Sequence, residues 1–200
     1  MKLFYSYPIP LTVFFFLIFA SVFAQNDYQK GYVITLENDT LWGYIKDRKP
    51  TGLLPKIRFK GNNMKKRFGP TKIIGYQVGD RYYESIWVDK QSRFLRENVV
   101  SISGKGERIF LRLLEKGKLV HYILEFQDQG EQLVQEIDYF KKEGSPQLIR
   151  VTQGLLGLKR KRVMAFLRDC PSLTERIERK TLKHAGEIAS YYNNECTSEN

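Results

Sequence analysis

The chain has 200 residues, with 33 Lys and Arg against 22 Asp and Glu, and so carries a formal net charge of +11. Its length fits one domain with a single hydrophobic core. The two histidines, His121 and His184, lie far apart and the carboxylates are scattered singly, so the sequence offers no metal-ligand cluster, nucleophile–base pair or carboxylate pair. We therefore expect a protein that is not an enzyme and that uses no cofactor or metal.

The first 24 residues are typical of a secretory signal peptide. Lys2 gives a positively charged start, an apolar run extends from Leu11 to Ala20, and compact residues precede Gln25. This order matches a signal peptide with cleavage between Ala24 and Gln25. The alternative, an uncleaved anchor, is disfavoured because the run is shorter than the roughly 20 residues that span a bilayer. We expect a soluble periplasmic or secreted chain with no integral membrane span, 176 residues long and carrying +10.

The mature chain begins with a predicted β-hairpin. Residues 32–37 and residues 41–46 each alternate between two sets of side chains, and Asn38-Asp39 lies between them. If Asn38-Asp39 is a two-residue turn, Leu36 faces Leu41 and one face of the hairpin is wholly apolar.

Further strands follow the hairpin, separated by short turns that mostly contain glycine. In the second hairpin, whose turn is Gly79-Asp80, the register places Tyr76 opposite Tyr83. The strands that we expect after the first hairpin span residues 56–60, 73–78, 81–88, 93–103, 108–115, 118–127, 133–142 and 148–151. The pattern predicts an antiparallel meander of about eight to ten strands, curled into a barrel-like or sandwich form.

The hydrophobic period changes from two to that of a helix after Gly157. Four apolar residues then recur at helical spacing: Val163, Phe166, Leu167 and Cys170. Ser172 and Glu175 have the spacing of a capping box and predict the start of a second helix. A third short helix is expected from His184 to Tyr192. The fold class is therefore mainly β, with two or three C-terminal helices.

The domain organisation follows from these elements. We expect a signal peptide over residues 1–24, a β-meander domain over 25–157, helices over 158–193 that pack on the same domain, and a disordered tail over 194–200.

Two cysteines remain in the mature chain, Cys170 and Cys196. An exported chain meets oxidising conditions, which permit a disulfide between them. The alternative is a buried Cys170 that packs as a small apolar residue, with a free Cys196 in a frayed tail. The sequence leaves both alternatives open.

A basic segment is the clearest functional signal. Between Lys46 and Lys72 ten cations accompany one acid, so this segment carries +9 of the mature charge. Six cations are expected to share one surface, three on a strand and three in the adjoining loop: Lys56, Arg58, Lys60, Lys65, Lys66 and Arg67. Such a patch could hold phosphates of a glycolipid or of nucleic acid, or it could be only a solvated face. The absence of a nucleic-acid-binding motif disfavours nucleic acid.

The sequence resembles a group of small exported proteins common in Bacteroidetes. The similarity rests on three segments, GYVITLENDTLWGYI, FLRLLEKGKLVHYILEF…YFKKEG and FLRDCPSLTERI…IASYYN. It implies an exported, β-rich protein and assigns no activity. It also implies that Asp39-Thr40-Leu41 is an O-glycosylation pattern with Thr40 as acceptor; in a eukaryote Asn38 would instead be an N-glycosylation site, and the remaining alternative is an ordinary turn.

The sequence thus favours a non-catalytic exported envelope or interaction protein, whose partner is an envelope protein or a polyanionic glycolipid. A polyanion binder that uses the segment Lys46–Lys72 is the alternative, and an enzyme of unknown class is a second one.

Processing of the N-terminus gives a direct test. We expect the protein recovered from its native host to begin at Gln25, because signal peptidase cleaves after the small residue Ala24. Mass spectrometry of the intact chain measures this. A chain that keeps Met1 and stays in the membrane fraction would contradict the prediction.

Overall fold

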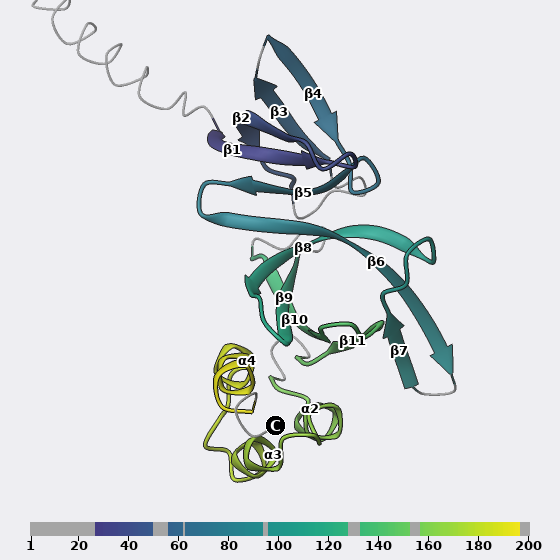
Figure 1. The fold of residues 1–200 in the computed structure, drawn as a ribbon, viewed down its shortest axis with the longest axis vertical. Helices are drawn as coiled ribbons and strands as arrows, with labels where there is room; N and C mark the ends of the chain where they lie inside the picture. Colours follow the sequence, from purple (N-terminus) through teal and green to yellow (C-terminus); the bar gives the residue numbers. More distant parts are fainter. Residues whose placement is uncertain are drawn as a thin grey trace, which may run out of the picture.

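The computed structural model describes residues 27–49, 56–61, 63–93, 96–127, 133–152 and 157–196. The predicted signal peptide, its cleavage site and residues 197–200 lie outside this part of the chain. Within it, eleven strands form one antiparallel sheet and three helices follow them (Figure 1). The predicted fold class, mainly β with C-terminal helices, is confirmed. None of the helices in these ranges is long and apolar enough to cross a membrane.

The first five strands are β1 (Tyr28–Thr35), β2 (Thr40–Lys46), β3 (Ile57–Gly61), β4 (Met64–Phe68) and β5 (Ile73–Val78). The next six are β6 (Arg81–Arg93), β7 (Arg96–Val100), β8 (Glu107–Glu115), β9 (Leu119–Phe126), β10 (Gln135–Lys142) and β11 (Gln147–Arg150). The helices are α2 (Arg160–Phe166), α3 (Pro171–Glu178) and α4 (Ala185–Asn194).

The sheet divides into a barrel and a curved extension that share β6. Six strands, in the order β6-β7-β11-β10-β9-β8, close into a barrel through the additional pairing of β6 with β8. The strands β4-β3-β2-β1-β5 continue the sheet from β6 and form the upper part of the molecule in Figure 1. We call this five-stranded part the extension. β6 is longer than the expected 81–88 because its last residues, Asp89 to Arg93, pair with β7.

Alternation of side chains gives each part its own core. The core of the extension lies between the extension and the outer surface of the barrel, and its buried side chains include Val33, Ile45, Ile57, Phe59, Phe68, Tyr76, Tyr83 and Phe110. A second cluster belongs to the barrel strands and contains Val88, Val99, Leu111, Tyr122, Ile137, Tyr139 and Leu148. The predicted pairing of Tyr76 with Tyr83 is confirmed, and the two rings stack with centroids 4.7 Å apart.

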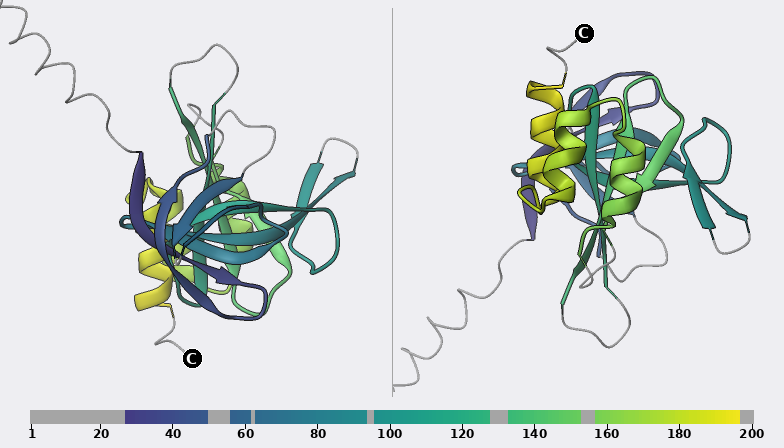
Figure 2. Two further views of the ribbon diagram at one scale, coloured as in Figure 1. Left: turned by 90° about the horizontal axis from the view of Figure 1, so that it is seen from above. Right: turned by 90° about the horizontal axis from the view of Figure 1, so that it is seen from below.

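The three helices pack against barrel strands and form a third core with them. Figure 2 (right) shows them side by side in front of the strands. Leu119 and Phe140 of the barrel are buried against helical side chains, among them Val163, Leu167, Leu173, Ile177 and Ile188. The four predicted residues, Val163, Phe166, Leu167 and Cys170, do face this core. The helix is shorter than predicted, because α2 ends at Phe166 and Cys170 precedes α3. The capping box is wrong: α3 begins at Pro171, and Ser172 lies inside its first turn without capping it.

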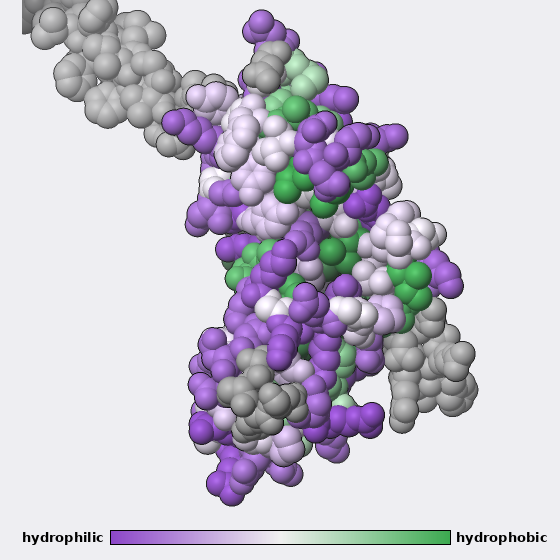
Figure 3. Space-filling view, in the orientation of Figure 1, coloured by the Kyte–Doolittle hydropathy of each residue, from purple (hydrophilic) through white to green (hydrophobic). Residues whose placement is uncertain are grey.

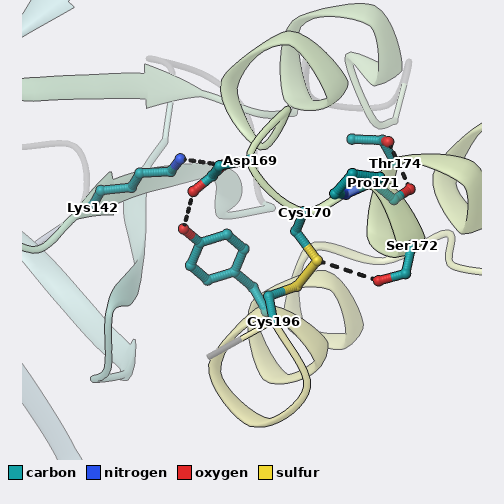
Figure 4. Close-up of a disulfide and its surroundings, with 8 residues drawn as sticks. Lys142, Asp169, Cys170, Pro171, Ser172, Thr174 and Cys196 are labelled. Carbon is teal, nitrogen blue, oxygen red and sulfur yellow. Dashed lines mark hydrogen bonds and ion pairs between the residues drawn. A yellow bond between two sulfur atoms is a disulfide. The ribbon is translucent and has the colours of Figure 1, made fainter. Parts of the chain in front are cut away.

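Cys170 and Cys196 form a disulfide that links the start of α3 to the end of α4 (Figure 4). Cys196, expected in a frayed tail, is buried against the helical core. Next to the bridge, Asp169 accepts hydrogen bonds from Lys142 of β10 at 2.5 Å and from the Tyr192 hydroxyl at 2.6 Å. The bridge and this pair of bonds fix the helices to each other and to the barrel.

The first hairpin has a different register from the predicted one. Thr35 ends β1, and a four-residue loop with Asn38 in the left-handed region (φ 67°) leads to Thr40. Leu41 therefore pairs with Val33 and not with Leu36, which is exposed. Because the shift is an odd number of residues, it exchanges the two faces of β1 relative to β2.

The disulfide generates a stability prediction. Replacing both Cys170 and Cys196 with alanine should lower the free energy of unfolding by about 3 kcal/mol, because the bridge closes a loop of 26 residues and restricts the unfolded chain. Urea denaturation followed by circular dichroism measures the loss. The unmodified protein in excess reductant serves as the matched control and should show a similar loss; an unchanged midpoint in both would contradict the prediction.

Candidate polyanion-binding surface

The candidate site is the face of the extension that points away from its core. Val33, Ile45, Ile57, Phe59 and Phe68 are buried, so the residues between them in each strand project to the opposite side. We call this side the basic–aromatic face and define it by Tyr28, Lys30, Tyr32, Trp42, Tyr44, Lys46, Arg58, Lys60, Lys65, Arg67, Gln77 and Tyr82.

Cross-strand pairing arranges these side chains in rows. One row runs from Lys30 through Tyr44 and Lys60 to Lys65. The next runs from Tyr28 through Lys46 and Arg58 to Arg67. Strands β1 to β4 contain no Asp or Glu. At the upper end of Figure 3, which these strands form, strongly hydrophilic side chains (purple) lie beside side chains of intermediate hydropathy (white).

The cations of this face differ in how far they are already engaged. Lys46 forms an ion pair with Asp27, whose pKa this hydrogen bond lowers. Lys60 Nζ lies 3.8 Å from the centroid of the Tyr28 ring. Four others are exposed and make no ion pair within the described part of the chain: Lys30, Arg58, Lys65 and Arg67. These four are available to a ligand.

The structure brings together most of the predicted basic residues but corrects two features. Residues 65–67, expected in a loop, belong to β4 because the chain turns at 61–64 and pairs back along β3. Lys66 therefore points to the opposite side from its neighbours, with Nζ 5.2 Å from the centroid of the Phe68 ring. Lys56 is exposed just before β3 and has the same alternation as Arg58.

The aromatic half of this face was not predicted from the sequence. Trp42 is 67% exposed and Tyr44 50% exposed, and Tyr32 contacts Trp42 with ring centroids 4.8 Å apart. A shallow hollow of about 430 Å³ lies over these rings, with Lys30, Gln77 and the backbone of Gly31 and Gly43 among its walls. Tyr82 lies next to Tyr32 with ring centroids 6.4 Å apart, and burial raises the pKa of its phenol to about 12. The correct hairpin register would have revealed the cluster.

A buried charge network joins the extension to the barrel. Arg48, just after β2, pairs with Glu125 of β9 at 3.4 Å, and their side chains are 5% and 8% exposed. Arg112 reaches the other oxygen of Glu125 at 3.3 Å, and the Tyr83 hydroxyl donates to Glu125 at 2.9 Å. Burial, and then nearby carboxylates, raise the pKa of Tyr83, which keeps the phenol protonated as a donor.

The same network extends to Asp47. The Tyr76 hydroxyl donates to Asp47 at 2.6 Å, and Arg81 lies 3.3 Å from this carboxylate. Perturbed buried groups often mark active sites, but here the two carboxylates are saturated by arginines and tyrosines of the protein itself. This arrangement fits a structural joint between the two parts of the sheet.

Two further polar groupings are also explained by the fold. His121 is buried, and its Nε2 lies 2.7 Å from Asp138, which also accepts a hydrogen bond from the Thr152 hydroxyl. Among the described residues no group of three or more His, Cys, Asp or Glu could hold a metal ion.

A larger groove of about 1140 Å³ lies between β11 and α2. Lys142 on its wall is already paired with Asp169.

Thr40, the residue expected to accept a sugar, is exposed at the first position of β2. Its modification remains a prediction.

No protein-family model, curated protein or solved structure matches the chain.

The buried network predicts that substitutions at Arg48 and Glu125 have coupled effects on the free energy of unfolding. Replacing Glu125 with alanine should cost about 3–5 kcal/mol of unfolding free energy, because Arg48 would be left buried without its counter-charge. The double change Arg48→Met with Glu125→Leu should cost clearly less, since both charges are then removed. Urea denaturation measures each value, and Glu143→Ala at an exposed turn is the control that should have little effect. Additive costs for the two network positions would contradict the coupling.

Proposed function

We propose that the protein is a non-catalytic exported protein that binds a polyanion through the basic–aromatic face. The observation that carries this proposal is the pairing of like charges across neighbouring strands. Arg58 lies opposite Arg67, and Lys60 lies opposite Lys65, on strands without a carboxylate. Four positive charges thus occupy adjacent positions of one surface.

The cost of this arrangement in folding free energy is an argument that the face binds an anionic ligand. Like charges directly opposite each other destabilise a sheet, and within β3 and β4 nothing compensates for Arg58 and Arg67. A polyanion seated on these strands would replace the repulsion with attraction and would release its condensed counterions. The proposal therefore explains why the face keeps an arrangement that costs folding stability.

The chemistry recognised is a series of closely spaced anionic groups. An exported protein meets such groups on phosphorylated envelope glycolipids, on acidic polysaccharides and on nucleic acid outside the cell. The expected location thus agrees with the proposed ligand class without selecting one source. A protein partner in the envelope would instead need a complementary acidic surface.

The test compares two variants of equal charge. The face variant carries Arg58→Gln, Lys65→Gln and Arg67→Gln. The control variant carries Lys105→Gln, Lys116→Gln and Lys118→Gln, three exposed lysines outside the extension. Both lose three positive charges, and the control should keep the melting temperature because exposed charges contribute under about 1 kcal/mol each. The face variant should keep or slightly raise it, since it removes two like-charge pairs from β3 and β4.

The face variant should elute from heparin at lower salt than the control. The slope of log affinity against log salt should become shallower by about two to three, in proportion to the number of anionic groups that the variant no longer neutralises. Binding to lipid A vesicles and to a DNA oligonucleotide distinguishes the sources. Equal losses in both variants would show that only net charge matters, and unchanged retention of the face variant would overturn the proposal.

A further inference from the structure

We infer that the polyanion is a single-stranded nucleic acid, with its phosphates on β3 and β4 and its bases stacked on the rings of β1 and β2. The inference rests on the proposed function and names its ligand. It depends on how charge and aromatic surface are distributed over the basic–aromatic face.

The two kinds of contact are unevenly distributed over the strands. Three of the four exposed cations of this face without an ion pair in the described part of the chain, Arg58, Lys65 and Arg67, lie on β3 and β4, whereas the exposed rings of Trp42 and Tyr44 lie on β2. Of the cations on β1 and β2, Lys46 is paired with Asp27, and Lys30, the fourth exposed cation, lines the hollow beside the rings. Neighbouring strands are about 4.8 Å apart, so the rings lie one or two strand spacings from the charges.

A nucleic acid strand separates the same two features. Its charge runs along the phosphate backbone, and its bases are uncharged planar rings held to one side. Proteins that bind single strands combine a positive track for the backbone with aromatic rings for the bases. In an acidic polysaccharide the charged group is attached to the sugar ring, so cations and aromatic rings would be needed at the same positions.

The aromatic half is built to receive a planar group. Trp42 is 67% exposed, and Tyr32 supports it from one side at 4.8 Å. Tyr32 in turn lies 6.4 Å from Tyr82, so the rings continue across the sheet towards β6. Gln77, on the wall of the hollow, brings a side-chain amide to its edge. A duplex would keep its bases stacked on each other, so only a single strand can use these rings.

The absence of a sequence motif disfavoured nucleic acid in the sequence analysis. The aromatic residues and the cations come from separate segments, residues 28–44 and residues 58–67, and only the pairing of β1, β2, β3 and β4 places them on one surface. The assembled face supplies the aromatic platform that the linear sequence did not show.

The experiment separates base stacking from charge. Binding of the protein to oligo(dT) is compared with binding to an abasic oligonucleotide of equal length, which keeps the phosphates and lacks the bases. The unmodified protein should bind oligo(dT) more tightly. Trp42→Ala should reduce affinity for oligo(dT) by about 5-fold or more, as stacking of one base contributes, and should leave affinity for the abasic strand and the salt slope unchanged.

Tryptophan fluorescence gives a second readout. The chain has two tryptophans, and Trp87 is half-buried with the Arg108 guanidinium 5.7 Å from its ring. In a Trp87→Phe background Trp42 is the only emitter, and oligo(dT) should quench it while the abasic strand should not. Trp87→Phe alone is the matched control and should leave oligo(dT) affinity unchanged.

Each outcome decides one of the two proposals. Equal binding of oligo(dT) and the abasic strand, lost in the face variant but not in Trp42→Ala, would overturn the nucleic-acid inference and leave the polyanion function standing. Trp42-dependent binding of heparin or lipid A without binding of oligo(dT) would also overturn it, in favour of a sugar chain. If no polyanion binds more strongly to the unmodified protein than to the face variant, the proposed function itself fails.

Discussion

The fold depends on one long strand, β6, whose backbone groups form hydrogen bonds with other strands along both of its edges. Buried N–H and C=O groups need hydrogen bonds, and Tyr82 to Glu84 of β6 pair with β5 and with β8 at once. Beyond Val88 the partner changes to β7, which allows the same strand to complete a closed barrel. The residues just before β8 pack closely against β6 at this point. A Cβ atom at Gly106, which has a positive φ, would lie 2.2 Å from the Val88 carbonyl oxygen. Closure removes the free edges that open sheets expose.

Sharing one strand would leave the extension free to rock against the barrel if nothing else joined them. Two contacts prevent this. The stacked rings of Tyr76 and Tyr83 hold β5 to β6, and Glu125 of β9 binds both Arg48, just after β2, and the Tyr83 hydroxyl. Separating a buried ion pair is costly, because each charge would be left without its partner. The extension is therefore held as a rigid platform, and the opposite end of the barrel is held by the helices and their disulfide.

Register decides what the platform presents to solvent. In a strand an odd shift exchanges the buried and exposed sets of residues, and the four-residue loop before Thr40 makes such a shift relative to the turn expected from Asn38-Asp39. It buries Val33 beside Leu41 and places Tyr32 beside Trp42, on the same side as the cations of β3 and β4. The basic half of the candidate site followed from alternation in residues 56–60. The pairing of Tyr32 with Trp42 did not, because it depends on the register between β1 and β2.

Local patterns determined much of this protein: most of the strands, the turn at Gly79-Asp80, the change to helices after Gly157 and the pairing of Tyr76 with Tyr83 follow from side-chain period and glycine positions. The excess of positive charge in residues 46–72 is likewise a property of the sequence. Only the tertiary structure decided that β4 pairs back along β3, that β6 closes a barrel with β8, and that Cys196 reaches Cys170. These contacts join residues far apart in the chain, and their free energy comes from burial and backbone pairing that no short segment contains. The basic–aromatic face arises from such contacts, because only strand pairing places the cations of β3 and β4 beside the rings of β1 and β2.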